Sequence, residues 1–324
     1  MPSVRDLRDR IRSLKNTQQI TKAMKQVAAA KIRRAEEARK RARPYADALA
    51  EMLADLMAAV SSVDHPFMKP GNEGAPAGIV LMSADKGLAG AFNSNVIHAG
   101  ETFARGRSGV RYYTVGLKAR SAVRRMGVSE HPTWPLGGAS KIATAREVAS
   151  RTADDFVRGS ISEIVLVSQK LVSMMSQRPQ TRKLVPVLAE DLKAFAGTNA
   201  DTQEQSRAAR GAVEFSPSPE FVLSRLLPKY LEFTLYSAML ETEAAFFAAQ
   251  LVAMTNATDN ASKLIDELTI AMNNARQAAI TKELLEIVGG AEALGVECLL
   301  LQESLLRAHL NLVSRRRTIL ARNV

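Results

Sequence analysis

The sequence is poor in cysteine, in aromatic residues and in long apolar runs, and each scarcity excludes a class of protein. Cys298 is the only cysteine among 324 residues, which excludes an internal disulfide framework and a cysteine-rich metal site. Aromatic residues make up 5% of the chain, whereas alanine and leucine are abundant, a bias toward helix. No run reaches the roughly 18 apolar residues of a membrane-spanning helix, and we expect no signal peptide because residues 1–10 contain no apolar segment.

Glycine is absent from Ser3 to about Val63, and Pro44 is the only proline in that stretch. Two rows of residues recur there every seven positions: the first is apolar or small except at Thr21, and the second is apolar at its ends and polar in its middle. Such a 3-4 repeat predicts a coiled-coil helix over residues 1–63, roughly 87 Å long at about 1.5 Å per residue, with a weak central seam. The rows are Leu7, Leu14, Thr21, Ala28, Ala35, Ala42, Leu49, Leu56 and Val63, and Val4, Ile11, Gln18, Lys25, Ile32, Arg39, Ala46, Leu53 and Val60.

Positive charge is concentrated on this first helix. Residues 1–43 contain fourteen Lys or Arg and four Asp or Glu, so they hold nearly all of the net charge of +11. This excess indicates an acidic protein surface, a nucleic acid or an anionic membrane as partner, or simply a solvated helix face. Aromatic residues are not interleaved with the basic ones, and no fingerprint of a nucleic-acid-binding fold is present.

The pattern changes after a Pro- and Gly-rich break at residues 65–76. Apolar runs at 78–83, 110–115, 161–172 and 182–187 predict strands, with residues 177–180 separating the last two. Helical patterns begin near Phe92 and cover 119–126 and 141–158. Strands that alternate with helices indicate a small Rossmann-like α/β module over residues 76–194, followed by a polar loop at 195–219.

A second long helical pattern begins near Leu223 and contains no glycine or proline after Pro228 until Gly289-Gly290, which we expect to end the helix. The predicted helix, residues 220–290, matches the first in length. The simplest architecture is therefore an antiparallel coiled coil of the two terminal helices, with the module attached at one end. Residues 291–324 form an extension with an amphipathic pattern of its own.

We find no set of residues in the sequence that predicts chemistry. The loop Ser83–Asn93 follows a predicted strand and precedes a helix, as a phosphate-binding loop does. However, Gly87 and Gly90 lack the spacing of known phosphate-binding motifs, so we interpret the loop as a structural turn. The histidines are scattered without the spacing of metal ligands; they are His65, His98, His131 and His309. We assign no catalytic, cofactor-binding or metal-ligating residue.

Four segments resemble one family in the correct order. They are RDLRDRIRSLKNTQQITKAMKQVAAAK at 5–31, SADKGLAGAFN at 83–93, FSPSPE at 215–220, and NATDNASKLIDELTIAMNNARQAAITKELLEIVGGAEAL at 256–294. Together they resemble the gamma subunit of F-type ATP synthases, of the bacterial type, over about residues 3–294.

The resemblance implies a rotor without catalytic residues of its own. The two terminal helices would form a curved coiled coil inside a ring of three alpha and three beta subunits. The α/β foot would rest on the membrane c ring beside the epsilon subunit, at the cytoplasmic face of the bacterial plasma membrane. Proton flow would turn the c ring and the shaft, and catalysis would take place on beta. No cofactor is implied, and neither a membrane span nor nucleic acid binding belongs to this role.

The resemblance also implies contact residues, which divide into three groups. Coupling positions of the family map onto Met24 and onto Arg276, Gln277, Thr281 and Glu283. Lys22, Lys25, Lys31, Arg33 and Arg34 would face acidic lever loops of beta. Gln250 stands where bacterial members often carry arginine, so a contact there is missing or replaced. The plainer interpretation is seam packing for Met24 and a solvated helix face for Gln277 and Thr281.

Two questions remain open at the level of sequence. The family normally ends near Ala293-Leu294, whereas about 30 residues follow here. Such a tail would emerge at the top of the hexamer, fold back or plug the rotor, unless it is a read-through product. The alternative functions are a basic coiled coil that binds nucleic acid or anionic membrane, and an enzyme built on the module, which would have to bind nucleotide.

Overall fold

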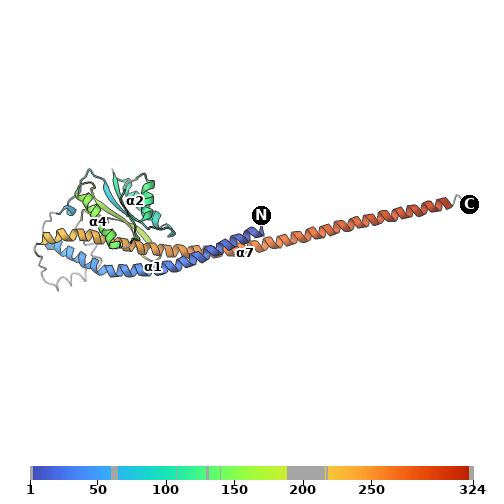
Figure 1. The fold of residues 1–324 in the computed structure, drawn as a ribbon, viewed down its shortest axis with the longest axis horizontal. Coiled ribbons are helices and arrows are strands. Elements are labelled where there is room, and N and C mark those ends of the chain that lie inside the picture. Colours follow the sequence, from blue (N-terminus) through green and yellow to red (C-terminus); the bar gives the residue numbers. More distant parts are fainter. Residues whose placement is uncertain are drawn as a thin grey trace. The chain divides into compact units, whose positions relative to one another are not determined.

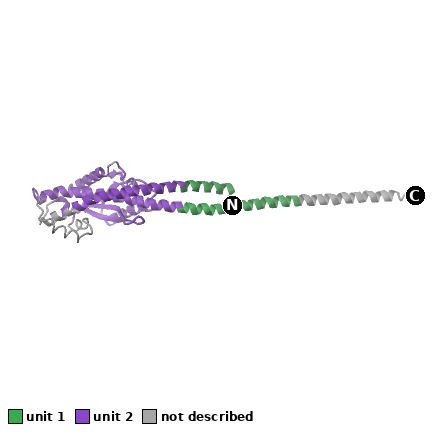
Figure 2. Cartoon of the chain, turned by 90° about the horizontal axis from the view of Figure 1, so that it is seen from below, with its two compact units in different colours: residues 1–18, 259–324 green, residues 19–258 purple. Residues whose placement is uncertain are grey.

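The computed structural model describes residues 3–59, 65–107, 109–128, 131–138, 140–187, 216 and 218–320. Within these ranges the side chains of residues 50, 51, 54, 55, 57–59, 219 and 293–320 are left undescribed. The chain forms two compact units, residues 1–18 with 259–324 and residues 19–258 (Figure 2). Most of the expected loop at 195–219 lies outside the described residues, as do residues 60–64.

Two long helices, which together we call the shaft, begin and end the described chain. Helix α1 covers Val4–Ala59 and α7 covers Pro219–Leu320. The prediction of two helices of matched length is wrong, because α1 has 56 residues and α7 has 102. None of the described helices combines the length and the apolar character that crossing a bilayer requires.

The difference in length arises at Gly289-Gly290, where the expected helix end does not occur. Helix α7 continues through both glycines to Leu320. A glycine that caps a helix C-terminus takes a positive φ, and neither glycine is among the positive-φ residues of the chain. Glycine lowers helix stability by about 1 kcal/mol relative to alanine, which weakens a helix without ending it.

Within residues 19–258 the helices of the shaft run antiparallel. Contacts join Thr21 to Thr258, Arg39 to Glu241 and Tyr45 to Phe233, so the partner on α7 moves backward as the residue on α1 moves forward. The buried side chains of α1 follow the predicted heptad rows; they include Ala28, Ile32, Ala35, Leu49, Leu53 and Leu56. The predicted coiled coil is therefore confirmed in this unit.

In the other unit the start of α1 packs on α7 in the same way. Leu7 and Ile11 are buried, as is Ala261 on α7. The amide nitrogen Nε2 of Gln18 donates to the hydroxyl of Ser262 at 2.7 Å. Two polar residues of the predicted seam, Gln18 and Thr21, are thus hydrogen-bonded to α7.

The module contains a five-stranded sheet in the order β3-β2-β1-β4-β5. Strands β1 to β4 are parallel, and β5 is antiparallel to β4. The strands are β1 Ala77–Met82, β2 Val110–Val115, β3 Thr133–Trp134, β4 Ile164–Leu171 and β5 Gln177–Val185. The helices of the module are α2 Phe92–Arg105, α3 Leu117–Arg125 and α4 Lys141–Val157, with a short 3-10 helix η1 at Pro66–Met68. The predicted α/β alternation is confirmed.

Two details of the sheet differ from the prediction. Residues 177–180, expected to separate two strands, form the first part of β5, and Pro179 pairs with Gln169. A proline is tolerated there because β5 is an edge strand, where a missing N–H need not interrupt a ladder. Strand β3 was not predicted, because two residues are too few to establish an alternating pattern.

The two faces of the sheet bury different partners. Ile79, Leu81 and Tyr112 pack with α2 and α3 on one face. Val80, Met82 and Tyr113 belong to a larger core on the other face, which contains residues of α4 and of both shaft helices. The module therefore packs laterally against the shaft, with α4 beside it (Figure 1).

Candidate functional site: the shaft–module junction

The part of α7 that contacts the module is apolar on nearly all sides, with a few isolated acidic residues. Between Leu223 and Met254 the only acidic residues are Glu232, Glu241 and Glu243. A carboxylate removed from water is costly unless it is paired. All three are paired with groups of other elements, and we call these three contacts the shaft–module junction.

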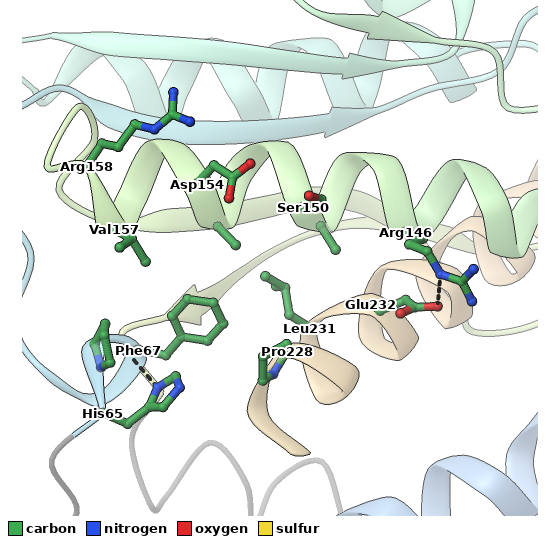
Figure 3. A pocket seen from close by; sticks show the side chains of 13 residues that line it. His65, Phe67, Arg146, Ser150, Asp154, Val157, Arg158, Pro228, Leu231 and Glu232 are labelled. Carbon is green, nitrogen blue, oxygen red and sulfur yellow. Dashed lines mark hydrogen bonds and ion pairs between the residues drawn. The ribbon is translucent and has the colours of Figure 1, made fainter. Parts of the chain in front are cut away.

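Glu232 connects α7 to the middle of α4. Its Oε1 lies 3.1 Å from Nε of Arg146, and its Oε2 lies 2.8 Å from Nζ of Lys229 on α7 itself. Glu232 is 8% exposed, so both carboxylate oxygens are partnered where water is scarce. The contact crosses the gap between α4 and α7 in Figure 3.

Glu243 connects α7 to the first residue of α4. Its Oε2 lies 3.2 Å from Nζ of Lys141, and both side chains are about one-fifth exposed. Because Lys141 and Arg146 stand five positions apart on α4, that helix is held to α7 at two separate points. Two contacts along one helix resist rotation of that helix about either contact.

Glu241 connects three elements. Its Oε1 accepts the backbone N–H of Leu171 at the end of β4 (3.3 Å) and lies 3.9 Å from Nη1 of Arg39 on α1. Burial raises the pKa of this carboxyl, and the opposing charge of Arg39 offsets part of that increase. Glu241 is therefore a partly desolvated carboxyl group at the point where α1, α7 and the sheet meet.

Aromatic side chains reinforce the junction. Arg182 of β5 donates to the hydroxyl of Tyr230 at 2.9 Å. The rings of Phe92 and Phe246 are 5.7 Å apart between centroids, in edge-to-face geometry. Apolar burial and edge-to-face rings add stability that does not depend on charge. The arrangement holds the module and the shaft helices in a fixed relation.

A hollow of about 440 Å³ lies beside the Arg146–Glu232 contact, between η1, α4 and the start of α7 (Figure 3). Phe67, Leu231 and Pro228 form its apolar part, and His65 stands at its edge. Burial lowers the pKa of His65, whose Nδ1 accepts the backbone N–H of Phe67. A neutral imidazole with one nitrogen already engaged favours a structural role at this position.

The loop at 83–93 behaves as the structural turn that we expected. The carboxylate of Asp85 accepts three backbone N–H groups, from Leu117 (3.0 Å), Leu136 (3.2 Å) and Gly137 (2.7 Å). It therefore connects the chain segments that follow β1, β2 and β3. In a doubly wound fold, ligands commonly bind at this edge of the sheet. Here the carboxylate of Asp85 already accepts hydrogen bonds from backbone N–H groups at that edge.

The predicted contact residues on α1 lie on its surface. Lys22, Lys31, Arg33 and Arg34 are exposed, and Met24 and Lys25 are partly exposed. Nζ of Lys31 lies 5.2 Å from the ring centroid of Phe247 on α7, a cation–π contact. The other cations are available to a partner, while Met24 lies between seam and surface.

The predicted contact residues on α7 fall in different units. Gln250 is partly exposed in the unit that contains the module. Arg276, Gln277, Thr281 and Glu283 are exposed in the other unit, and Thr281 donates to the backbone carbonyl of Gln277 (2.9 Å). Neither group belongs to the shaft–module junction.

Sequence reasoning missed the junction residues altogether. Their signal was nevertheless present, because single acidic residues within an apolar helical segment must find cationic or N–H partners. The identity of those partners was not accessible: Arg39, Arg146 and Leu171 come from three segments that only the fold brings together.

Comparisons with known proteins agree with this architecture. A family model described as ATP synthase matches residues 3–294. The ATP synthase gamma chain of Heliobacterium modesticaldum is 42% identical over 296 residues, which covers 91% of this chain and all of the relative. That of Phenylobacterium zucineum is 40% identical over 302 residues, with the same coverage of both chains.

Solved structures give the same result for the fold. A chain of the Euglena gracilis mitochondrial ATP synthase, in a structure of its OSCP, F1 and c-ring, matches with a TM-score of 0.63 at 20% identity, covering 90% of this chain and 94% of that one. A chain in the central stalk and c-ring structure of the Tetrahymena thermophila enzyme matches with a TM-score of 0.53 at 21% identity, covering 74% and 99%.

A long helical pair that carries a laterally packed α/β module is the fold that this chain shares with chains of solved ATP synthase structures. The match over residues 3–294 and the identities of 40–42% are more specific than the fold. The chain belongs to the family of ATP synthase gamma chains, the non-catalytic rotor subunits of that complex. This membership decides against the alternative of a nucleic-acid- or membrane-binding coiled coil.

Proposed function

We propose that this chain transmits torque between the membrane c ring and a catalytic hexamer of alpha and beta subunits, coupling proton flow to ATP synthesis or hydrolysis. The module receives the force from the c ring and the epsilon subunit, and the shaft delivers it inside the hexamer. The catalytic residues then lie on beta. The complex stands at the cytoplasmic face of a bacterial plasma membrane, with this subunit held peripherally.

One observation carries this proposal most directly. Every described residue of α7 from Arg276 to Glu292 is exposed, including large apolar ones. Ile280, Leu284, Leu285, Ile287 and Val288 are 50–68% exposed. A run of exposed apolar side chains on one helix indicates a surface that a partner covers. A surrounding sleeve of alpha and beta subunits would cover it from all sides.

The shaft–module junction supports the same function from the other end. A rotor must pass force from its foot to its shaft without slipping at the connection. Arg146–Glu232, Lys141–Glu243 and the Glu241 contacts join α4, α1 and β4 to one helix. Helix α1 adds stiffness, because it contains no glycine.

The basic face of α1 is proposed to meet acidic lever loops of beta. Lys22, Lys25, Lys31, Arg33 and Arg34 would make solvated contacts there, each contributing about 0–1 kcal/mol. Contacts this weak guide a turning shaft without holding it at one angle. Met24, Gln250, Arg276, Gln277, Thr281 and Glu283 are proposed as further coupling contacts with the sleeve.

The contact proposal is tested by neutralising the five cations of α1 to glutamine in the reconstituted complex. We expect proton-coupled ATP turnover to fall while assembly is preserved. The matched control neutralises five exposed cations of the module; they are Arg105, Lys118, Arg120, Arg124 and Arg125. Unchanged coupled turnover in the α1 variant would contradict the proposed contacts.

The extension beyond the family match is tested in the same assay. A chain that ends at Leu294 retains every residue that the family model matches. If residues 295–324 plug the rotor, their removal raises the rotation-coupled turnover. If they emerge from the hexamer or are a read-through tail, removal leaves the turnover unchanged.

A further inference from the structure

The hairpin of β4 and β5 ends in an apolar tip, residues Val172–Ser176, which we call the hairpin tip. Val172, Met174 and Met175 are 56%, 40% and 82% exposed. Single exposed apolar residues are normal on a protein surface, whereas three within four positions form a patch. Methionine is common on surfaces that bind other proteins, because its flexible thioether adapts to a partner.

The hairpin tip is internally fixed by hydrogen bonds. The backbone N–H groups of Val172 and Ser173 donate to the carbonyl of Ser176, at 3.1 and 3.0 Å. The hydroxyl of Ser173 accepts from the N–H of Ser176 at 3.0 Å, and the side chain of Gln177 donates to the carbonyl of Met174 at 3.0 Å. A turn ordered in this way loses little conformational entropy when a partner binds it.

The base of the hairpin is attached to the shaft. Leu171 packs against the cluster that contains Phe92 and Phe246, and its N–H donates to Glu241 of α7. Two residues earlier, the side chain of Gln169 donates to the backbone carbonyl of Phe92 at 2.9 Å. A force applied to the hairpin tip therefore reaches α7 directly through the base of the hairpin.

The charged residues of the hairpin itself are all positive. No Asp or Glu occurs between Ile164 and Val187, and the exposed Lys170 and Arg178 are direct cross-strand partners. Like charges opposite each other destabilise a sheet. Glu241 interacts electrostatically with Lys170, but its Oε1 already accepts the N–H of Leu171 and forms an ion pair with Arg39. An external acidic group would relieve this repulsion.

A recess lies at the base of the same hairpin. It has a volume of about 190 Å³ and is lined by uncharged residues of β4, β5, α2 and α7, including Gln169, Gln177, Asn95 and Asn256. It is large enough to receive one side chain of a partner that contacts the hairpin tip.

From this patch, its rigidity and its charge, we infer that the hairpin tip docks an acidic segment of a neighbouring subunit in the complex. Apolar side chains of that segment contact Met174 and Met175, and its carboxylates pair with Lys170 and Arg178. The inference rests on the proposed function, since it takes the partner from the same complex. It assigns to the module a second contact with the stationary subunits or with a rotor partner, separate from the basic face of α1.

Photo-cross-linking tests the inference in the assembled complex. Met175→Cys, placed in a Cys298→Ser background, gives one thiol for a benzophenone maleimide, and at 82% exposure the substitution leaves the core untouched. We expect the probe to join a peptide of another subunit that is rich in Asp and Glu. Val157→Cys, on α4 and 58% exposed, is the matched control and should not label that peptide.

The charge requirement is tested by adding Lys170→Gln and Arg178→Gln to the labelled chain. We expect the yield of the cross-link to fall about three- to tenfold, as the loss of two solvated ion pairs predicts. Any of three results would overturn the inference. They are a cross-link to a segment without acidic residues, no cross-link in an active complex, or a cross-link yield that both substitutions leave unchanged. If the complex shows normal proton-coupled ATP turnover but the hairpin tip forms no cross-link, only the docking site is refuted. If the complex shows no proton-coupled ATP turnover, the proposed function is refuted.

Discussion

Arg146 of α4 and Glu232 of α7 meet at 3.1 Å, between the guanidinium Nε and the carboxylate Oε1. The carboxylate belongs to a residue that is 8% exposed, while the arginine side chain is 63% exposed. The contact therefore lies at the edge of the core, where an ion pair keeps some strength and the arginine remains hydrated. It is one of the points at which the module meets the shaft.

We predict a measurable coupling energy between these two residues. In a double-mutant cycle with Arg146→Met and Glu232→Gln, the coupling should be about 1 kcal/mol, measured by denaturant unfolding. The control pair is Arg43 and Asp47 on α1, 74% and 53% exposed at 3.6 Å, where we expect less than about 0.5 kcal/mol. Additive effects at Arg146 and Glu232 would show that the contact does not hold the module.

Replacing Glu241 by glutamine should change how stability depends on pH. Burial raises the pKa of this carboxyl above its ordinary value of 4.5, so the folded chain binds the proton more tightly than the unfolded chain does. The resulting stabilisation is present below pH 4.5 and is lost as the pH rises through the raised pKa. Glutamine stays neutral, so the stability of Glu241→Gln relative to the natural chain should increase with pH across that window. Thermal unfolding between pH 4 and pH 8 measures this, and a difference that shrinks as the pH rises would contradict it.

Gly116 should be intolerant of a side chain. Its φ is +97°, and an added Cβ would lie 2.1 Å from the carbonyl oxygen of Ser83. Gly116→Ala should therefore destabilise the chain by about 2–4 kcal/mol, because backbone strain and a steric clash add. Gly106→Ala is the matched control, with φ of −91° and nothing within 4 Å of the added Cβ; it should change stability by less than about 1 kcal/mol.

At Gly289 and Gly290, where α7 continues as a helix, we expect alanine to stabilise the chain, in contrast to Gly116. Because the residues are helical with nothing within 4 Å of an added Cβ, Gly289→Ala and Gly290→Ala should each stabilise the helix by about 1 kcal/mol. Far-ultraviolet circular dichroism during thermal unfolding measures the gain in helix. If either glycine instead ended the helix with a positive φ, alanine would reduce the helical signal.

The fold was largely accessible from the sequence because its main signals are periodic. The heptad rows of α1 correspond to buried positions such as Leu7, Ala28 and Leu53, and β2 was predicted at Val110–Val115, where it lies. The failures occurred where one residue type has two possible roles. Pro179 continues an edge strand rather than ending it, and Gly289-Gly290 continues a helix rather than capping it.

The shaft–module junction was not accessible in the same way. Glu232, Glu241 and Glu243 stand in one segment, but their partners on other elements are distant in the sequence. The nearest is Leu171, 70 residues before Glu241, and the farthest is Arg39, 202 residues before it. No local pattern specifies such pairs, because they depend on how α1, α4 and β4 pack against α7. By contrast, the residues proposed to contact the sleeve, such as Lys22 and Gln277, follow from family resemblance and stay predictions.

Rotation of single complexes tests the central claim most directly. With the alpha and beta subunits fixed to a surface, a bead is attached to the module through Ser121→Cys in a Cys298→Ser background; Ser121 is exposed on α3. We expect that adding ATP turns the bead continuously in one direction, because the shaft–module junction carries torque to the module. Continued ATP hydrolysis with only undirected fluctuation of the bead would contradict it.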